Sequence, residues 1–452
     1  MLELSYIRAK DPGGRSAAIV DAIKNSSIRK LYIQLARRVP QIVSVARAII
    51  RFARGEVVFR QLLVPEKNSP REWRTVTKLS HFVKAAGLTP VVLAHAESAA
   101  VLTATTYPEN DNARILSQPQ EINFPEIYTV SVADALVVPA TNFIILKNHI
   151  ICHDLLDLLQ QKPSEELISY LQFNSSQTQA RTKLTFHIHD ELPEAAHFLD
   201  AAALNYAHWI TEILPRIALF CSKPMFAHVP LLIDEYLPKS MLDSLEIVAG
   251  ESRKIFVLSR GIAVRVKTLH VVSVSGYIPF EFRHDPDMNK IHGQFSPVAL
   301  RFLRELVLKS LTTNSALTET PKKIFIERTS TQRVLKNQSG LKNIFSENSF
   351  ECISPETLSF LDQARVFANA EEIVGATGAA FANLLFCSSP CKLTILIGDH
   401  PETPYGYWAN IATAIGLRVR FVLGFSDAPL KAGIHRDFSI SEKTILSLIE
   451  HG

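Results

Sequence analysis

Two hydrophobic patterns alternate along most of the chain. Short apolar runs rich in Val, Ile and Phe are typical of buried strands, whereas segments with apolar residues at every third or fourth position are typical of amphipathic helices. Between residues 230 and 275 the order is strand VPLLID, helix PKSMLDSLEIVAG, strand KIFVLS and strand AVRVKTLHVVS. A strand, a helix and a strand in succession favour a parallel sheet.

The segments before residue 230 are shorter. A helix is expected over residues 73–86, ended by Gly87, and a strand over residues 90–95. Residues 128–152 hold short β-branched and aromatic runs between polar turns, which predict a meander of short strands.

A polar segment at residues 309–323 predicts a linker, and the alternation restarts beyond it. Strands are expected at KIFIER, FECIS, EEIVGAT, KLTILIG and VRFVLG, with helices at residues 340–346, 356–370, 379–387, 408–415 and from Ser441. The two series predict an α/β protein with two facing Rossmann-like domains, residues 61–315 and 316–452, behind a basic N-terminal segment of residues 1–60.

Composition narrows the class of protein. The chain has 452 residues, of which 47% are hydrophobic and 20% charged, so it has ample material for buried cores and is not a disordered or fibrous protein. Its five cysteines show no Cys-x-x-Cys spacing, which argues against a disulfide framework and a zinc ribbon. No stretch reaches the roughly 18 apolar residues that a spanning helix needs, so we expect a soluble or surface-attached protein.

The charge is divided unevenly. Residues 1–60 hold twelve Lys or Arg and four Asp or Glu, a net charge of +8, whereas the other 392 residues carry −4. The slightly acidic body gives no argument for nucleic-acid binding. Residues 28–59 alternate Arg with apolar residues at loose helical spacing, which fits either a helix on anionic lipid headgroups or a solvated basic helix that packs on its own domain or on a partner.

Residues 375–383, GATGAAFAN, follow an apolar strand and open a helix. Small residues at such a turn let an anion approach backbone N–H groups at the positive end of the helix dipole. The two glycines are spaced Gly-x-x-Gly, which is not the dinucleotide fingerprint. Tight packing of the helix on the sheet would explain the small residues equally well.

Residues 205–216, NYAHWITEILPR, place polar residues on one helical face. His208 and Glu212 are one turn apart, Asn205 lies beside them, and Arg216 continues the line. A His–Glu pair can abstract a proton from a hydroxyl group, with either residue as the base. The alternative is an ordinary surface ion pair.

Arg328 ends the strand KKIFIER, and Arg333 follows it. Ligands of open α/β sheets bind outside the carboxyl ends of the strands, where an arginine can contact phosphate oxygens in a bidentate manner. A structural ion pair is the alternative for each arginine.

Together these three stretches resemble glycosyltransferase family 61, whose bacterial members are often described as capsular polysaccharide biosynthesis proteins. The family has an Asn-Tyr-x-His helix that continues to an acid and Leu-Pro-Arg, a strand ending in Arg with a second Arg some five residues on, and a Gly-Pro-His-Gly-Ala-Gly-Leu-Thr-Asn turn before an apolar helix. The matching segments here are NYAHWITEILPR, IERTSTQR and GATGAAFANLLF. Their order and spacing match over roughly residues 125–425.

The resemblance implies a GT-B architecture and a metal-independent, inverting transfer of a hexosyl, pentosyl or related sugar. It implies a nucleotide-sugar donor on the C-terminal domain and a glycan or lipid-linked glycan acceptor on the N-terminal domain, with no cofactor. His208 or Glu212 would then be the base. Donor-binding residues would be Arg328, Arg333, Thr377, Gly378, Ala379 and Asn383, and acceptor-binding residues Asn205 and Arg216.

The resemblance also implies a setting. Capsule or lipopolysaccharide assembly would place the protein in the cytoplasm, or on the inner membrane with residues 1–60 as the tether to anionic lipid. Nucleic acid is not an expected partner.

Two departures leave alternatives open. The family's His in the glycine turn is Thr377 here, and its second inner Gly is Ala380, which would suit a catalytically reduced subunit that binds a nucleotide sugar or a glycan.

His187 and His189 suggest a metal-dependent hydrolase instead, but they fall in an expected strand and no further ligand is marked by spacing.

Overall fold

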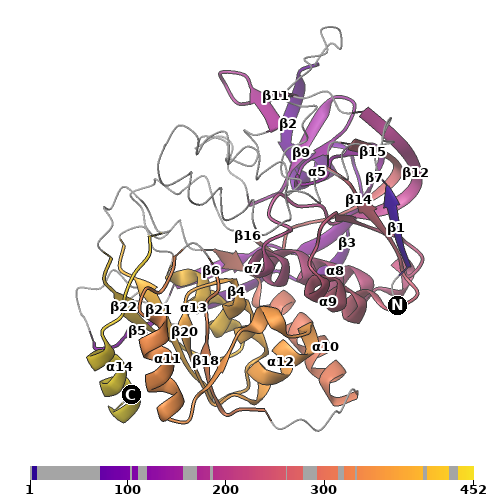
Figure 1. The fold of residues 1–452 in the computed structure, drawn as a ribbon. Helices are drawn as coiled ribbons and strands as arrows, with labels where there is room; N and C mark the ends of the chain where they lie inside the picture. The colour runs from indigo at the N-terminus through magenta and orange to yellow at the C-terminus, as the bar shows by residue number, and fades with distance from the viewer. Residues whose placement is uncertain are drawn as a thin grey trace, which may run out of the picture.

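The computed structural model describes residues 3–7, 72–101, 104–109, 120–155, 170–183, 187–260, 262–277, 293–313, 320–330, 333–400, 405–426 and 436–451. The basic segment of residues 1–60, apart from residues 3–7, lies outside the described residues. Two sheets organise the described chain (Figure 1).

The larger sheet combines parallel and antiparallel strands. Its order is β1 (Glu3–Ile7), β14 (Lys254–Leu258), β13 (Leu231–Asp234), β12 (His187–His197), β15 (Ile262–Val272), β7 (Ile127–Val137), β8 (Ile144–Ile145), β9 (His149–Cys152), β2 (Arg74–Lys78), β11 (Gln179–Thr182) and β10 (Leu171–Phe173). The strands from β1 to β15 are parallel, whereas β7 runs antiparallel to β15 and also pairs with β3 (Val91–Ala94).

A switch point lies beside β12. From β12 the chain passes through α7 (Tyr206–His208), η1 (Trp209–Ile213), α8 (Leu214–Cys221) and the short η2 (Pro224–Phe226) to β13, and then through α9 (Lys239–Ala249) to β14. It then returns to the other side of β12 as β15. The order of strands therefore reverses between β12 and β15, which is where open α/β sheets bind ligands.

The smaller sheet is wholly parallel. Its order is β19 (Glu351–Ile353), β18 (Lys323–Ile326), β20 (Glu372–Ala376), β21 (Lys392–Gly398), β22 (Val419–Gly424) and β5 (Thr105–Thr106). Its helices are α11 (Gln338–Glu347), η5 (Pro355–Thr357), α12 (Phe360–Asn369), the 3-10 helix η6 (Ala379–Phe386), α13 (Gly406–Ala414) and α14 (Glu442–His451). This sheet also has a switch point, between β18 and β20.

Helix α10 (Pro297–Thr313) packs between the two sheets' helical layers. It contacts α8 and α9 on one side and α12, α13 and η6 on the other. One continuous buried cluster accordingly extends from Trp209 and Ile233 to Phe360 and Ile395. The far face of the smaller sheet packs on α11 and α14 through Phe345 and other apolar residues. The α/β class is confirmed, whereas two facing GT-B domains divided at residue 315 stay a prediction.

The remaining described elements are short. Helix α5 (Leu79–Ala85) packs on β2 and β9, and two small ribbons pair β4 (Glu97–Val101) with β6 (Gln120–Phe124) and β16 (Gly276–Tyr277) with β17 (Gln294–Phe295). Within the described ranges, none of the helices combines the length and apolarity needed to cross a bilayer.

The order expected for residues 230–275 is confirmed, but some boundaries differ. The helix expected at residues 73–86 begins only at Leu79, because the β-branched residues from Thr75 to Thr77 pair as strand β2 with β9 and β11. Such pairing overrides local helix propensity. The first short runs expected within residues 128–152 form one long strand, β7, and α10 extends into the expected linker.

Candidate active site

A helix interrupted by a π-turn carries the His–Glu motif. Asn205 caps it, since its side-chain oxygen accepts a hydrogen bond from the Ala207 N–H at 3.0 Å. The π-turn η1 follows, in which the Leu214 N–H bonds to the Trp209 carbonyl. Pro215 comes next and has no N–H to donate. Such π-turns recur at functional sites.

His208 and Glu212 form a buried pair. His208 Nδ1 lies 2.8 Å from Glu212 Oε1, and the two residues are only 7% and 8% exposed. The alternative of a solvated surface pair is therefore wrong. Charges in such a site interact more strongly than at the surface because water screens them less.

Arg216 stands next to this pair and is 4% exposed. Its Nε donates to the Glu212 backbone carbonyl at 2.9 Å, and its Nη2 lies 3.6 Å from Asp200 Oδ2. Burial lowers the pKa of Arg216, opposed by both acids, and raises the pKa of Asp200, opposed by Arg216. The charge of Arg216 and the charge of Asp200 therefore stabilise each other where burial disfavours both.

Asp234, at the end of β13, holds the Asp200 segment in place. It accepts hydrogen bonds from the backbone N–H groups of Ala140 at 2.6 Å and Asp200 at 2.8 Å. Burial raises the pKa of Asp234 to about 7. Asp234 therefore ties the loop before β8 to the loop after β12.

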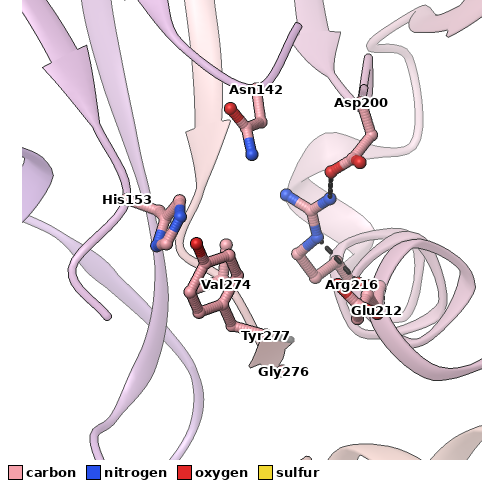
Figure 2. A pocket seen from close by; sticks show the side chains of 8 residues that line it. All are labelled: Asn142, His153, Asp200, Glu212, Arg216, Val274, Gly276 and Tyr277. Carbon is pink, nitrogen blue, oxygen red and sulfur yellow. Dashed lines mark hydrogen bonds and ion pairs between the residues drawn. The ribbon is translucent and has the colours of Figure 1, made fainter. Parts of the chain in front are cut away.

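A polar pocket opens at the switch point of the larger sheet (Figure 2). It is small and partly open, with a volume of about 10 Å³, which is room for about one water molecule. Its lining residues come from the ends of several strands and from the motif helix: Asn142, His153, Asp200, Glu212, Arg216, Val274, Gly276 and Tyr277. Figure 2 shows Asn142, His153 and Tyr277 across the pocket from Asp200, Arg216 and Glu212.

Four of these polar residues were missed by the sequence analysis. Asp200 follows β12, so the rule that ligands bind beyond the carboxyl ends of strands would have found it. Asn142, His153 and Tyr277 carry no comparable signal, because they adjoin short strands whose neighbours only the tertiary structure defines.

His153 is an uncharged wall of the pocket. Burial, with help from Arg216 and Lys78, lowers its pKa to about 3, so the ring is neutral at pH 7. The ring centroid lies 4.3 Å from that of Tyr277. Its Nδ1 is buried and has no hydrogen-bond partner among the residues that the structure describes.

Arg328 lies at the switch point of the smaller sheet. Its Nη1 donates to the Thr377 carbonyl at 2.7 Å, which joins the end of β18 to the end of β20. The Gln338 side chain accepts from the Arg328 N–H at 2.8 Å and donates to its carbonyl at 3.2 Å. Burial and then Arg333 lower the pKa of Arg328 to about 10, while Glu356 opposes this shift.

Arg333 is the second cation of this region. Its backbone has a φ of 52°, in the left-handed region. Its buried Nε has no hydrogen-bond partner among the described residues, and burial lowers its pKa. Two arginines close enough to repel each other favour an anion as the ligand between them.

The turn after β20 is tightly packed. A Cβ atom at Gly378 would lie 2.1 Å from Arg328 Nη1, so only glycine admits the guanidinium there. Thr377 is 2% exposed, and its hydroxyl accepts a hydrogen bond from Trp408 Nε1 at 3.1 Å. Ala379, the first residue of η6, is partly exposed.

Asn383 is fully buried and connects the two halves of the chain. Its side-chain oxygen accepts from the Tyr206 hydroxyl at 2.6 Å, and its nitrogen donates to Gln363 Oε1 at 2.9 Å. The segment that follows β20 is thereby joined to the helix that carries His208.

A second connection runs through α13. The Tyr407 hydroxyl lies 3.4 Å from the Thr211 hydroxyl, and the Tyr407 ring packs edge-on against Trp408, which bonds to Thr377. Burial and then Glu212 raise the pKa of Tyr407. The predicted residues of both halves are therefore linked through two sets of contacts.

The structure gives no support for the metal-dependent hydrolase suggested by His187 and His189. His187 and His189 lie on strand β12, as expected, but the positions of their side chains are outside the described residues. Over the described ranges, no group of three or more His, Cys, Asp or Glu side chains is placed to hold a metal ion.

A protein-family model matches part of this chain. The model of the family described as Glycosyltransferase 61 matches residues 206–394, from the start of α7 into β21. The match includes His208, Glu212, Arg216, Arg328 and the turn at residues 375–379. No curated protein matches the chain. This part of the chain thus resembles glycosyltransferase family 61, a resemblance that supports a glycosyltransferase.

Proposed function

We propose that this protein is an inverting glycosyltransferase that moves a sugar from a nucleotide-sugar donor to a hydroxyl group of a glycan acceptor. The observation that carries the proposal is the buried contact of His208 with Glu212 beside a polar pocket. Arg328 is joined to this region through the Thr377 turn and α13, and Arg333 lies near Arg328. The two arginines add the cations that a diphosphate leaving group needs.

The reaction is a single displacement. The acceptor oxygen attacks the anomeric carbon, and its proton passes to His208. The bond between the anomeric carbon and the phosphate oxygen breaks, and the nucleoside diphosphate leaves with the electron pair. Glu212 Oε1 lies 2.8 Å from Nδ1, and we assign the proton transfer to the other ring nitrogen, Nε2. Glu212 orients the ring and stabilises the imidazolium that forms, as the acid of a Ser-His-Asp triad does.

The donor diphosphate lies against the two arginines and the turn. Guanidinium groups match phosphate oxygens in a bidentate manner, and the backbone N–H groups at Gly378 and Ala379 add further donors. Thr377 stands where the family has His. Its carbonyl holds Arg328, so Thr377 acts through that arginine. We propose that these cations replace a metal, so that turnover survives a chelator.

The remaining predicted residues have indirect roles. Asn205 caps the motif helix and Asn383 fixes it against η6, so both position His208 rather than touch substrate. Arg216 faces the acceptor pocket. In this proposal residues 316–452 bind the donor and residues 61–315 the acceptor.

The cellular setting is also a proposal. A glycan or lipid-linked glycan of capsule or lipopolysaccharide assembly would meet the enzyme on the cytoplasmic side of the inner membrane. The +8 charge of residues 1–60 would then hold the protein on anionic lipid. Deleting this segment should release the protein from anionic liposomes and preserve turnover on a soluble acceptor.

A catalytically reduced binding subunit is the second candidate, favoured by Thr377 in place of the family's His. Release of nucleoside diphosphate from a panel of nucleotide sugars, with and without glycan acceptors, separates the two. Acceptor-dependent release that falls about 10²- to 10⁴-fold in His208→Ala, with unchanged donor affinity, supports the enzyme and its base. Tight donor binding without acceptor-dependent release would leave only the binding subunit.

A further inference from the structure

The carboxyl edge of the smaller sheet carries chemistry beyond its two arginines. The strands β18, β20, β21 and β22 lie side by side in this order (Figure 1). One residue of interest lies just beyond the end of each: Arg328, Thr377, Asp399 and Phe425. Ligands of open parallel sheets bind along this edge. The proposed donor site uses the ends of β18 and β20, so the ends of β21 and β22 have no role in it yet.

Arg328, Asp399 and Phe425 continue one face of this sheet. Successive side chains of a strand point to opposite faces, so residues two apart share a face. The residue two positions before each of them packs in or against the buried cluster that joins the two halves of the chain: Ile326, Ile397 and Leu423. Thr377 bonds to Trp408 of α13 on that same face. A ligand lying along the edge can therefore reach all of them from one side.

Phe425 is the most exposed large apolar side chain among the described residues, at 76%. Its backbone is nevertheless fixed, because its N–H donates to the Ser439 carbonyl at 2.9 Å and its carbonyl accepts from the Ser439 N–H at 2.8 Å. The ring is thus held in water at a set place on the ligand-binding edge. Purine and pyrimidine bases have flat π-faces that stack on such a ring and cover it.

The separation of Phe425 from Arg328 suits a nucleoside diphosphate. Arg328 donates to the Thr377 carbonyl, so its guanidinium lies at the end of β20, two strands away from β22. The ladder partners of β20, β21 and β22 put Thr377 level with Leu423, and Phe425 lies two residues farther along. Strand spacing and rise per residue then separate Thr377 from Phe425 by about 12 Å. A nucleotide whose diphosphate contacts Arg328 can bring its base to Phe425.

Asp399 lies between these two ends. It is exposed and follows β21, the strand between β20 and β22. In nucleotide-binding α/β sheets an acidic residue at a strand end accepts hydrogen bonds from ribose hydroxyls. The edge therefore offers cations, a carboxylate and an aromatic ring in succession. Diphosphate, ribose and base follow one another in the same order in a nucleotide.

We propose that Phe425 stacks on the nucleobase of the donor, while Asp399 binds its ribose. The inference rests on the proposed function, because it extends the donor site of that proposal from the diphosphate to the whole nucleotide. Phe425 lies at the end of the site opposite to the arginines, so it sets donor affinity rather than the rate of sugar transfer. Stacking on a phenyl ring accepts any base, so purine and pyrimidine nucleotides both gain from it.

Calorimetric titration of the full-length protein with nucleoside diphosphates and with inorganic pyrophosphate tests the stacking. Phe425→Ala should weaken uridine and guanosine diphosphates roughly 5- to 100-fold and leave pyrophosphate unchanged, since pyrophosphate has no base. Phe425→Trp should restore the affinity, whereas Phe425→Leu, which is apolar without a ring, should not. Leu446→Ala, exposed on α14 in the same half of the chain, is the matched control and should bind like wild type.

Saturation-transfer NMR of bound uridine diphosphate gives an independent measure. We expect the base protons to receive the strongest transfer in wild type and to lose this rank in Phe425→Ala. Asp399→Ala should reduce the preference for uridine diphosphate over its 2′,3′-dideoxy analogue, because the carboxylate that accepts from the ribose hydroxyls is gone. An unchanged preference would overturn the placement of the ribose.

The outcomes separate this inference from the proposed function. Nucleotide affinity that is equal in wild type and Phe425→Ala, an equal loss for pyrophosphate, or rescue by Phe425→Leu overturns the stacking and leaves a diphosphate site at the arginines. Failure of wild type to bind any nucleoside diphosphate instead rejects the proposed function itself.

Discussion

Replacing Gly378 by alanine should detach Arg328 from the turn and leave the fold intact. The φ of Gly378 is 177°, which is extended backbone that alanine adopts readily. The added Cβ would lie 2.1 Å from Arg328 Nη1, whereas real Cβ contacts essentially never fall below 3.0 Å. The guanidinium must therefore move by about 1 Å, which its flexible side chain permits.

The displacement breaks the 2.7 Å hydrogen bond from Arg328 Nη1 to the Thr377 carbonyl. A hydrogen bond of a charged group contributes about 1.5–3 kcal/mol. If this bond positions the guanidinium for the diphosphate, nucleoside diphosphate affinity should fall roughly 10- to 150-fold. The free energy of unfolding should fall by no more than the contribution of this bond, because the freed side chain can relocate toward solvent.

Calorimetric titration of uridine and guanosine diphosphates measures the effect, within a double-mutant cycle. Arg328→Ala should weaken binding by itself, and adding Gly378→Ala to it should cost nothing further. Gly340→Ala is the matched control, since its Cβ would also meet the end of a flexible side chain, Glu442, but between α11 and α14. Wild-type affinity in Gly378→Ala, or an equal loss with and without Arg328, would refute the reasoning.

Three further predictions concern stability. Tyr206→Phe leaves the buried Asn383 oxygen without its 2.6 Å partner and should lower the free energy of unfolding by about 1–3 kcal/mol in urea titrations, more than Tyr107→Phe does at its partly buried bond to Ser447. Asp234→Asn replaces one of the two oxygens that accept hydrogen bonds by an NH₂ group, so it should lower the free energy of unfolding by a similar amount. It should also slow sugar transfer to the acceptor. Unchanged stability would contradict the role assigned to Asp234. The pKa of His153 falls from 6.5 to about 3 on folding, so the unfolded chain binds the extra proton and stability is lost as pH falls below about 6.5. Between pH 7 and 5 this loss is worth about 2 kcal/mol, and a His153→Gln protein with the same pH dependence as wild type would disprove it.

The sequence predicted the motif helix and the contact of His208 with Glu212, because both depend on local spacing. His208 and Glu212 are four residues apart, so a helical backbone alone brings them to one face, and the structure confirms the contact. The π-turn over Trp209–Ile213 was not expected from the sequence. The place of Arg328 just beyond the carboxyl end of a strand was likewise predicted, whereas its role stays a prediction.

Other features depend on partners that are distant in the sequence. The helical spacing of residues 73–86 was misleading, because Thr75 to Thr77 gain ladder hydrogen bonds from strands far along the chain. Asn383 lies in the segment GATGAAFAN, which the sequence predicted to bind the donor, yet its side chain bonds to Tyr206 and Gln363. The predicted division into two domains falls within one continuous hydrophobic core, in which α10 contacts helices of both sheets. No local sequence pattern indicates this core.

The sequence by itself determined the α/β class, the strands whose ends carry Arg328 and Thr377, and the turn of helix that pairs His208 with Glu212. These features follow from the spacing of apolar residues along a helix or strand and from the spacing of His208 and Glu212. Both spacings involve only residues that are near one another in the sequence. Only the tertiary structure decided that Asn142, His153 and Tyr277 face Arg216 across one pocket. Their positions follow from β7, β8, β9 and β15 lying side by side in the larger sheet, and such pairing is decided by the burial of the whole core.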